Sequence, residues 1–305
     1  MGTPEIAARC LECMLDAGLD VVGAVTGKDK PRGRGNVMTP TAVKALALER
    51  GVAVYTPDSL RTEEFSSLLA QIDPELIVVV AYGKILPPAV LDYPKHGCIN
   101  LHVSLLPKYR GAAPMQRAVM SGDKETGVTV MYMAEGLDTG DIISQERFAI
   151  GAEDDFEAIH DRSYQVGGPL LVRTVADIEA GRATRTPQSE EGATYAAKIE
   201  KEDCKIDFSL PASVLDPIIR GVTPIPGAFC YQGNKMLKIN KATPVSGNGD
   251  VGKIIAVDAK GEGSFTVACG EGALKVTVCI PEGKGKMSAG DMLRGRKIAL
   301  GDILS

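Results

Sequence analysis

The sequence predicts an α/β fold in which a doubly wound, mostly parallel sheet is followed by a smaller β-rich domain. Short apolar segments alternate with amphipathic helical segments over the first 181 residues, which is typical of a parallel sheet covered by helices. One segment, residues 75–81, is an Ile/Val-rich run of the kind that is buried on both faces of such a sheet. After residue 198 the pattern changes to short β-like segments separated by turn residues.

The elements of the first region follow from local patterns taken in order. Thr3-Pro4-Glu5 is typical of a helix start, with Thr as N-cap, Pro at the first helical position and an acid in the first turn. Apolar residues at helical spacing predict this helix, ended by Gly18, and further helices at residues 40–50, 60–71, 88–91 and 154–181. Short apolar runs between the helices predict strands at residues 21–25, 52–55, 75–81, 99–102, 126–133 and 142–150.

The second region has a different character. Residues 182–198 are polar and punctuated by Pro and Gly, as expected of a linker. Turn residues then separate short β-like segments at residues 228–231, 235–239, 252–257, 264–269 and 273–278. About five strands at this spacing predict a small barrel or sandwich. We therefore expect domains at 1–181 and 199–305, joined by the linker.

The start of the chain does not fit the βαβ pattern. A helix that begins at residue 3 has no strand before it. A doubly wound sheet that lacks its first strand leaves the backbone groups of the neighbouring strands unpaired.

Composition limits the classes of protein. The chain has 305 residues, 44% of them hydrophobic and 24% charged, with a net charge of −5, which favours an ordered globular protein. No apolar run is long enough to span a bilayer, and the first residues lack the features of a signal peptide. The seven cysteines have no framework spacing, so we expect a reduced, cytoplasmic protein. Two local basic segments, residues 28–35 and 283–286, are either solvated loops or contacts for an anionic partner.

The candidate catalytic residues gather after the strand at 99–102. Asn100 and His102 are two residues apart, so they share one face of that strand. Asp138 lies between turn residues downstream. An amide donor, an imidazole and a carboxylate can stabilise an oxyanion and move a proton. Because no Ser or Cys nucleophile is evident beside them, we expect direct attack by a substrate. Taken singly, each residue also has a structural explanation, since Asp138 and Asp141 are ordinary turn residues.

The motifs for other cofactors are weak. Cys10 and Cys13 have helical spacing with no second Cys/His pair nearby, whereas a zinc site needs about four ligands. Gly33 and Gly35 form neither a dinucleotide fingerprint nor a P-loop. We therefore expect no metal.

Three sequence motifs carry a family resemblance. The run Asn100-Leu-His-Val-Ser-Leu-Leu-Pro-Lys-Tyr-Arg-Gly-Ala-Ala-Pro, with Glu125-Thr-Gly-Val-Thr-Val and Gly136-Leu-Asp-Thr-Gly-Asp, resembles the 10-formyltetrahydrofolate-dependent formyltransferases. The similarity covers essentially the whole chain and includes Gly2-Thr-Pro, Arg32-Gly-Arg-Gly, Val79-Val-Ala-Tyr-Gly-Lys-Ile-Leu-Pro and Lys286-Met-Ser.

The resemblance implies a Rossmann-like catalytic domain, a C-terminal OB-like β-barrel and a reaction. The formyl group of 10-formyltetrahydrofolate would pass to the α-amine of methionyl initiator tRNA, with the protein a monomer that needs no membrane. The family's catalytic trio falls on Asn100, His102 and Asp138, and its folate-binding residues on Ser104, Leu105, Leu106, Pro107, Ile85 and Leu86. The tRNA-binding residues would be Arg32, Arg34, Lys284 and Lys286.

The resemblance also implies a mechanism and shows departures. Asn100 and a protonated His102 would stabilise the tetrahedral oxyanion, while Asp138 would keep His102 charged. The family has a strand ahead of Gly2-Thr-Pro, so we expect that the true start lies upstream of Met1. Tyr109 stands where many members have Trp, and Val103 replaces a commonly small residue.

Two other functions remain open. An amino-sugar N-formyltransferase would use the same donor and trio with another acceptor, although the cationic segment 32–35 favours tRNA. A catalytically dead nucleic-acid-binding protein is the alternative from a different class, in which the missing strand disables the first domain.

Overall fold

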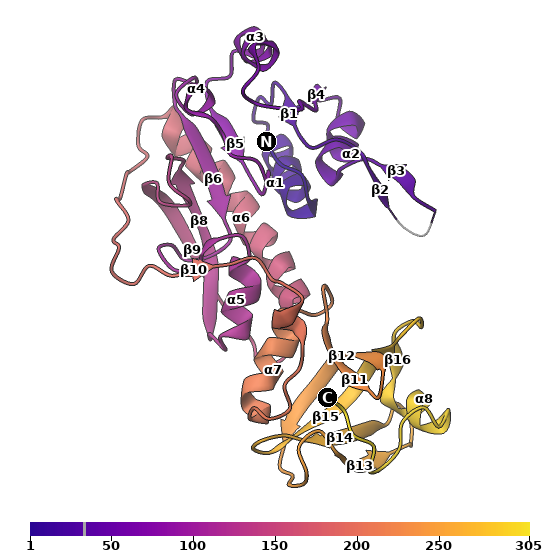
Figure 1. Ribbon diagram of the computed structural model, residues 1–305. Helices are drawn as coiled ribbons and strands as arrows, with labels where there is room; N and C mark the ends of the chain where they lie inside the picture. Colours follow the sequence, from indigo (N-terminus) through magenta and orange to yellow (C-terminus); the bar gives the residue numbers. More distant parts are fainter. Residues whose placement is uncertain (33–34) are drawn as a thin grey trace. The chain divides into compact units, whose positions relative to one another are not determined.

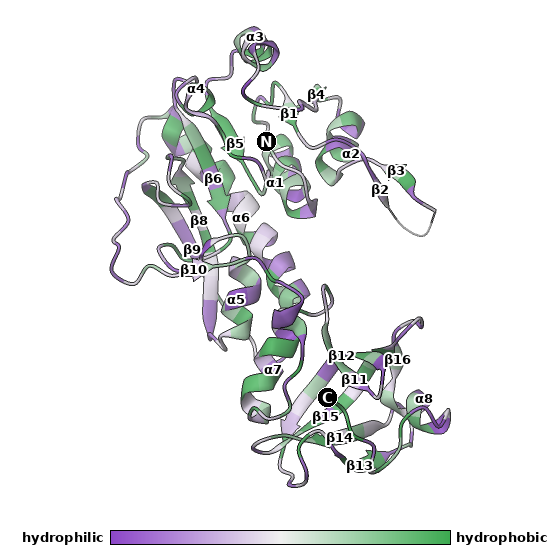
Figure 2. Ribbon diagram, viewed as in Figure 1, coloured by the Kyte–Doolittle hydropathy of each residue, from purple (hydrophilic) through white to green (hydrophobic). Residues whose placement is uncertain are grey.

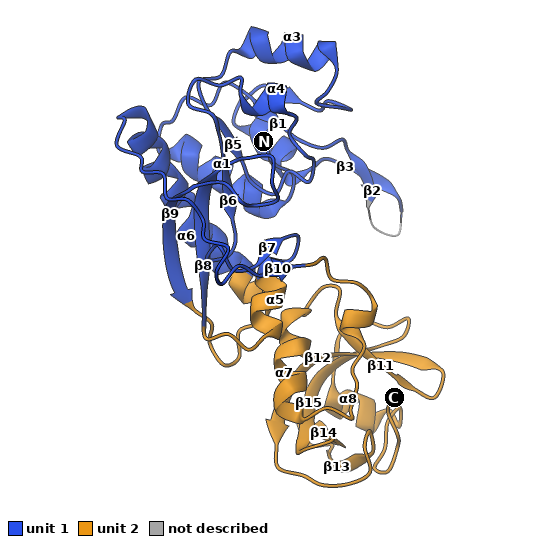
Figure 3. Ribbon diagram, turned by 60° about the vertical axis from the view of Figure 1, so that its left-hand side comes forward, with its two compact units in different colours: residues 1–114, 125–148, 160–196 blue, residues 115–124, 149–159, 197–305 orange. Residues whose placement is uncertain are grey.

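The computed structural model describes residues 1–32 and 35–305, which form two compact units (Figures 1 and 3). The first unit comprises Met1–Pro114, Glu125–Phe148 and His160–Ala196, and the second comprises Met115–Lys124, Ala149–Ile159 and Ala197–Ser305. The chain therefore passes between the units more than once. The expected domain boundaries at 181 and 199 stay a prediction.

A four-stranded sheet carries the candidate site in the first unit. Its strands, in the order β5-β6-β8-β9, are Ile77–Val79, Cys98–His102, Glu125–Tyr132 and Ile142–Ala149. β5 runs parallel to β6, with Val79 opposite Asn100, whereas β8 runs antiparallel to β6, with Thr129 opposite His102. The α/β prediction is confirmed, with the parallel pair β5–β6 at one edge of a mixed sheet and the antiparallel pair β6–β8 at its centre. Apolar side chains dominate β5 and β6 (Figure 2), as expected for strands buried on both faces.

Helices α1, α2, α3, α4 and α6 belong wholly or mainly to the first unit and span Glu5–Asp16, Ala42–Glu49, Glu63–Ile72, Pro88–Leu91 and Phe156–Glu179. α1 buries Ile6, Cys10 and Leu11 in one core cluster with residues of β6 and β8. The predicted Thr3 N-cap is wrong by one residue. Pro4 occupies the cap position, and the Thr3 hydroxyl donates to the Tyr82 carbonyl at 3.4 Å instead.

A groove interrupts the first unit between β5 and a separate parallel pair, β1 (Ala24–Val25) and β4 (Val54–Tyr55). Backbone hydrogen bonds of Met1 and Gly2 bridge the interruption. The Gly2 N–H donates to the Val25 carbonyl at 3.0 Å, and the Val80 N–H donates to the Met1 carbonyl at 2.9 Å. Beyond this bridge, a cavity of about 490 Å³ is lined mainly by apolar side chains. The expectation that the sheet lacks a first strand stays a prediction, and the groove borders the place where that strand would lie.

The second unit is built on an antiparallel sheet. Its path is β11-β12-β15-β14-β13, with β16 beside β15, and the strands span Ala228–Gln232, Lys235–Val245, Ala273–Pro281, Ser264–Ala268, Ile254–Asp258 and Met287–Ser288. α7 (Ala212–Gly221) packs on β12, and the short helices α5 (Pro114–Met120), η1 (Glu202–Cys204) and α8 (Ala289–Arg294) complete the unit. The β-rich prediction is confirmed for all five expected strands, and α7 was not predicted.

The segment predicted as a linker packs against the first unit. Its strand β10 (Tyr195–Ala196) runs parallel to β7 (Arg110–Gly111), which lies between the two catalytic motifs. We call residues 186–196 the strap. β2 (Lys30–Arg32), which lies within the basic segment 28–35, pairs antiparallel with β3 (Val37–Thr39). In the described part of the chain, no helix has the length and apolar character to cross a membrane.

Candidate active site

The carboxyl end of β6 carries two of the three predicted catalytic residues. Asn100 is half-buried and His102 is buried, and their spacing puts both side chains on one face of the strand. Ile99 and Leu101, between and beside them, are buried in the core behind that face. The apolar residues of β6 therefore hold the strand in the core, and its polar residues face the candidate site.

His102 has an acceptor near each ring nitrogen. Its Nε2 lies 2.8 Å from the Tyr109 carbonyl oxygen, and its Nδ1 lies 3.6 Å from Oδ2 of Asp138. Burial lowers the pKa of His102 below its usual value of 6.5, although the Asp138 carboxylate and the Tyr109 carbonyl oppose this shift. The resting imidazole is therefore neutral, which differs from the charged form expected from sequence, because desolvation outweighs the carboxylate.

Asp138 is held in an unusual backbone conformation. Its φ angle is +52°, in the left-handed region, which costs a non-glycine residue about 1–2 kcal/mol. In this conformation Oδ2 accepts a hydrogen bond of 2.8 Å from the Gly111 N–H. Gly111 has a φ of +119°, and a Cβ there would lie 2.8 Å from the Ala196 carbonyl oxygen. Only glycine fits between the strap and the Asp138 carboxylate.

The Asn100 amide is available to a ligand. In the described residues its side chain forms no hydrogen bond, and the residue is half-buried near the end of a strand. An amide donor with no protein partner can turn to an oxygen of a bound substrate. The structure thus brings His102 and Asp138 together and leaves Asn100 free on the same strand.

The predicted folate-binding loop, Ser104–Pro107, is held by side chains of β8 and β9. The Thr129 hydroxyl donates to the Ser104 carbonyl at 2.7 Å, and the Leu106 N–H donates to that hydroxyl at 3.2 Å. Gln145 donates to the Leu106 carbonyl at 2.9 Å. The side chains of Ser104 and Leu106 are buried, whereas Leu105 and Pro107 are half-buried. A ligand would reach the latter two side chains more readily.

The other predicted binding residues differ in exposure. Ile85 is 83% exposed and Leu86 is 4% exposed, so Leu86 belongs to the core. Lys284 and Lys286 are exposed on the connection between β15 and β16 in the second unit. Arg34 lies outside the described residues, and Arg32 is placed by its backbone at the end of β2.

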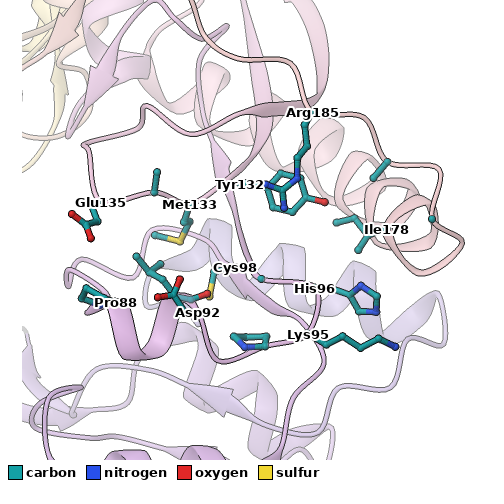
Figure 4. A pocket seen from close by; sticks show the side chains of 16 residues that line it. Pro88, Asp92, Lys95, His96, Cys98, Tyr132, Met133, Glu135, Ile178 and Arg185 are labelled. Atoms are coloured by element: carbon teal, nitrogen blue, oxygen red, sulfur yellow. The ribbon is translucent and has the colours of Figure 1, made fainter.

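A separate cavity of about 540 Å³ flanks the opposite end of β6. It is lined by polar and charged side chains, among them Lys95, His96 and Glu135, and Arg185 lies 3.7 Å from the centre of the Tyr132 ring (Figure 4). None of the predicted site residues lines it. The candidate active site is therefore the carboxyl end of β6, where open α/β sheets bind ligands.

The strap contributes side chains that sequence reasoning missed. Gln188 donates to the carbonyls of Asp138 and Gly140, each at 2.8 Å, and accepts from Arg110 Nε at 3.1 Å. Arg110 is buried and also donates to Glu190 at 2.9 Å. No local pattern marks a single Gln in a polar segment, so only the pairing of β10 with β7 reveals this contact.

The fold and this site define the class of protein. The formyl transferase family matches residues 1–175, and the family of formyl transferase C-terminal domains matches residues 198–297. The chain belongs to the formyl transferase family and is an enzyme of that class.

The relatives are more specific. The chain is 46% identical to the methionyl-tRNA formyltransferase of Methylobacterium nodulans over 100% of this chain and 98% of the relative. It is 42% identical to that of Neisseria meningitidis serogroup C over 99% of this chain and 98% of the relative. A solved methionyl-tRNA formyltransferase from Clostridium thermocellum is 21% identical with a TM-score of 0.50, over 67% of this chain and 88% of that one.

Proposed function

We propose that this enzyme transfers the formyl group of 10-formyltetrahydrofolate to the α-amine of methionyl initiator tRNA. The observation that carries the proposal is the full-length identity of 42–46% to enzymes of that name. The assembled pair His102–Asp138 and the free amide of Asn100 supply the chemistry that this reaction needs. Ser104, Leu105, Leu106, Pro107 and Ile85 are the proposed folate contacts, with Leu86 behind them.

The mechanism follows from the state of each group. The α-amine, with a free pKa of roughly 7.7–8.0, is partly neutral at physiological pH and attacks the formyl carbon. The new C–N bond forms as the carbonyl oxygen takes up negative charge, which the Asn100 amide stabilises. Neutral His102 accepts the proton of the attacking amine at Nδ1, and the Asp138 carboxylate stabilises the resulting imidazolium. The C–N10 bond then breaks, and His102 returns the proton to N10 of the leaving tetrahydrofolate.

The second unit and the β2–β3 hairpin are the proposed tRNA-binding parts. Lys284 and Lys286 are exposed cations suited to phosphate contacts, and Arg32 and Arg34 would contact the acceptor end. A long, irregular β12 that pairs with both β11 and β15 supports an OB-like barrel. The proposed setting is a monomer in the cytoplasm, where translation begins.

One assay tests the acceptor. Purified protein with 10-formyltetrahydrofolate is given either methionyl initiator tRNA or a UDP-amino sugar, and formylated product is measured. Formylation of the tRNA alone is the expected result. Formylation of the sugar alone would establish the amino-sugar enzyme instead. Binding of tRNA with neither product formed would establish a catalytically dead RNA-binding protein.

A further inference from the structure

The strap, which lies outside the two catalytic motifs, contributes hydrogen bonds to the turn that carries Asp138. Leu137 is exposed, and the ends of the turn are joined by the Tyr132 N–H, which donates to the Asp141 carbonyl at 2.9 Å. Its backbone carbonyls at Asp138 and Gly140 both accept hydrogen bonds from the two N–H groups of the Gln188 amide. One side chain of the strap therefore satisfies both carbonyls of the turn.

The Gln188 side chain also contacts β7, the segment that touches the catalytic pair from the other motif. Gln188 Oε1 accepts from Arg110 Nε, and Arg110 lies between the two residues whose backbone touches the catalytic pair. Tyr109 supplies the carbonyl beside His102 Nε2, and Gly111 supplies the N–H that binds the Asp138 carboxylate. Backbone pairing reinforces this link, since the Arg110 N–H donates to the Thr194 carbonyl at 2.8 Å.

We propose that Gln188 is a positioning residue that sets the Asp138 carboxylate against His102 by clamping the Asp138 turn to β7. The expected effect on turnover rests on the proposed function. The expected effect on the position of the Asp138 carboxylate does not. The amide is well suited to the task because it offers two donors and an acceptor in one plane. Neither methionine, which has a similar shape, nor glutamate, which lacks the donors, can replace it.

The kinetic test compares Gln188→Met and Gln188→Glu with Ser189→Ala. Ser189 lies on the same strap, is exposed and, among the residues that the structure describes, accepts a hydrogen bond only from the Glu191 N–H at 3.0 Å. Its variant should therefore keep wild-type kinetics. Both Gln188 variants should lower kcat by about 10–100-fold, as expected for a misplaced catalytic group, with the KM for the folate donor unchanged. A rise in that KM at constant kcat would overturn the proposal.

A double variant separates positioning from general damage to the fold. If Gln188 acts through Asp138, then Gln188→Met combined with Asp138→Asn should be no slower than Asp138→Asn alone. Multiplication of the two single losses would overturn the proposal. Circular dichroism of each variant shows whether the fold is kept, and Gln188→Glu serves if Gln188→Met does not fold.

A measurement without turnover distinguishes this inference from the proposed function. The chain has three histidines, His96, His102 and His160, so NMR can follow the pKa of His102 directly. The described groups that raise this pKa are the Asp138 carboxylate and the Tyr109 carbonyl. Gln188→Met should lower the pKa of His102 toward its value in Asp138→Asn, even if no acceptor is formylated. If the pKa of His102 is unchanged in Gln188→Met while the wild-type protein formylates methionyl-tRNA, the positioning role is refuted and the proposed function stands.

Discussion

The Asp138 carboxylate has two neighbours that determine its role. It accepts from the Gly111 N–H at 2.8 Å and stands 3.6 Å from Nδ1 of His102, beyond a direct hydrogen bond. The first contact orients the carboxylate, while the second leaves Nδ1 open to a substrate proton. Sequence predicted this meeting from a motif 36 positions away, but not that burial keeps the resting imidazole neutral. That balance depends on desolvation, which only the packed structure defines.

Changing either member of the pair should stop most of the chemistry. We expect His102→Ala and Asp138→Asn each to reduce kcat by about 10²–10⁴-fold, because they remove the proton acceptor or its stabilising charge. Asn tolerates the left-handed backbone, so Asp138→Asn changes the charge with little strain. Single-turnover formylation measures the effect. Asp141→Asn, in the same turn, is the matched control, and an equal loss there would argue against a special role for Asp138.

Asn100 should contribute to the transition state and little to binding. Removal of one oxyanion donor typically costs about 2.7–4 kcal/mol of barrier. Asn100→Ala should therefore lower kcat by about 10²–10³-fold, with a small change in the KM for either substrate. Steady-state kinetics provide both values. If KM rises while kcat is kept, the amide binds the ground state instead.

At the scale of elements, local patterns predicted the helices and strands with regular apolar spacing. Local patterns did not predict elements that form only through pairing with a distant segment. β7 and β10 are two residues each and exist only because the strap pairs with the segment after the folate loop. α7 contains Pro217 and lies among short strands, so its pattern was too brief to separate from a loop. The polar strap has the composition of a linker, since its contacts are hydrogen bonds and not apolar packing.

The groove beside β5 predicts how an added strand would behave. The Met1 amine lies 2.6 Å from the Val78 carbonyl oxygen, where a parallel strand would present a peptide N–H. We expect about five β-branched residues attached ahead of Met1 to fill the groove and raise the Tm. An extension of the same length made of Gly and Ser is the control. Equal Tm values for both extensions would show that the groove does not accept a strand.

The same extension should remove a pH effect. Burial lowers the pKa of the Met1 amine from 8.0 to about 6, so the unfolded chain binds more protons than the folded one between these values. The free energy of unfolding should therefore rise by about 2–3 kcal/mol from pH 6 to pH 8 through this group. His102, whose pKa is also lowered, adds an effect of the same sign. Denaturation at each pH should show a smaller rise in the extended protein, because a peptide N–H does not titrate.

At the scale of the whole molecule, the net charge of −5 gives little indication of an RNA substrate. The proposed contacts are local, so their test is the dependence of tRNA affinity on salt. We expect Lys284→Ser combined with Lys286→Ser to weaken binding and to lower the slope of log Kd against log salt concentration by roughly 1–2. Folate KM should stay constant. An unchanged slope would exclude these two lysines from the interface.

The strap also determines where the first unit can be cut away as an independent fragment. A fragment that stops at Gly181, the end of the predicted first domain, would lose Gln188, Glu190 and the Tyr195–Ala196 strand. Arg110, which is buried, would then lose the carboxylate of Glu190, and leaving an interior cation without its partner is costly. Trimming after Ala196 preserves these partners, so a short polar tail decides whether an isolated half of this enzyme keeps an ordered catalytic centre.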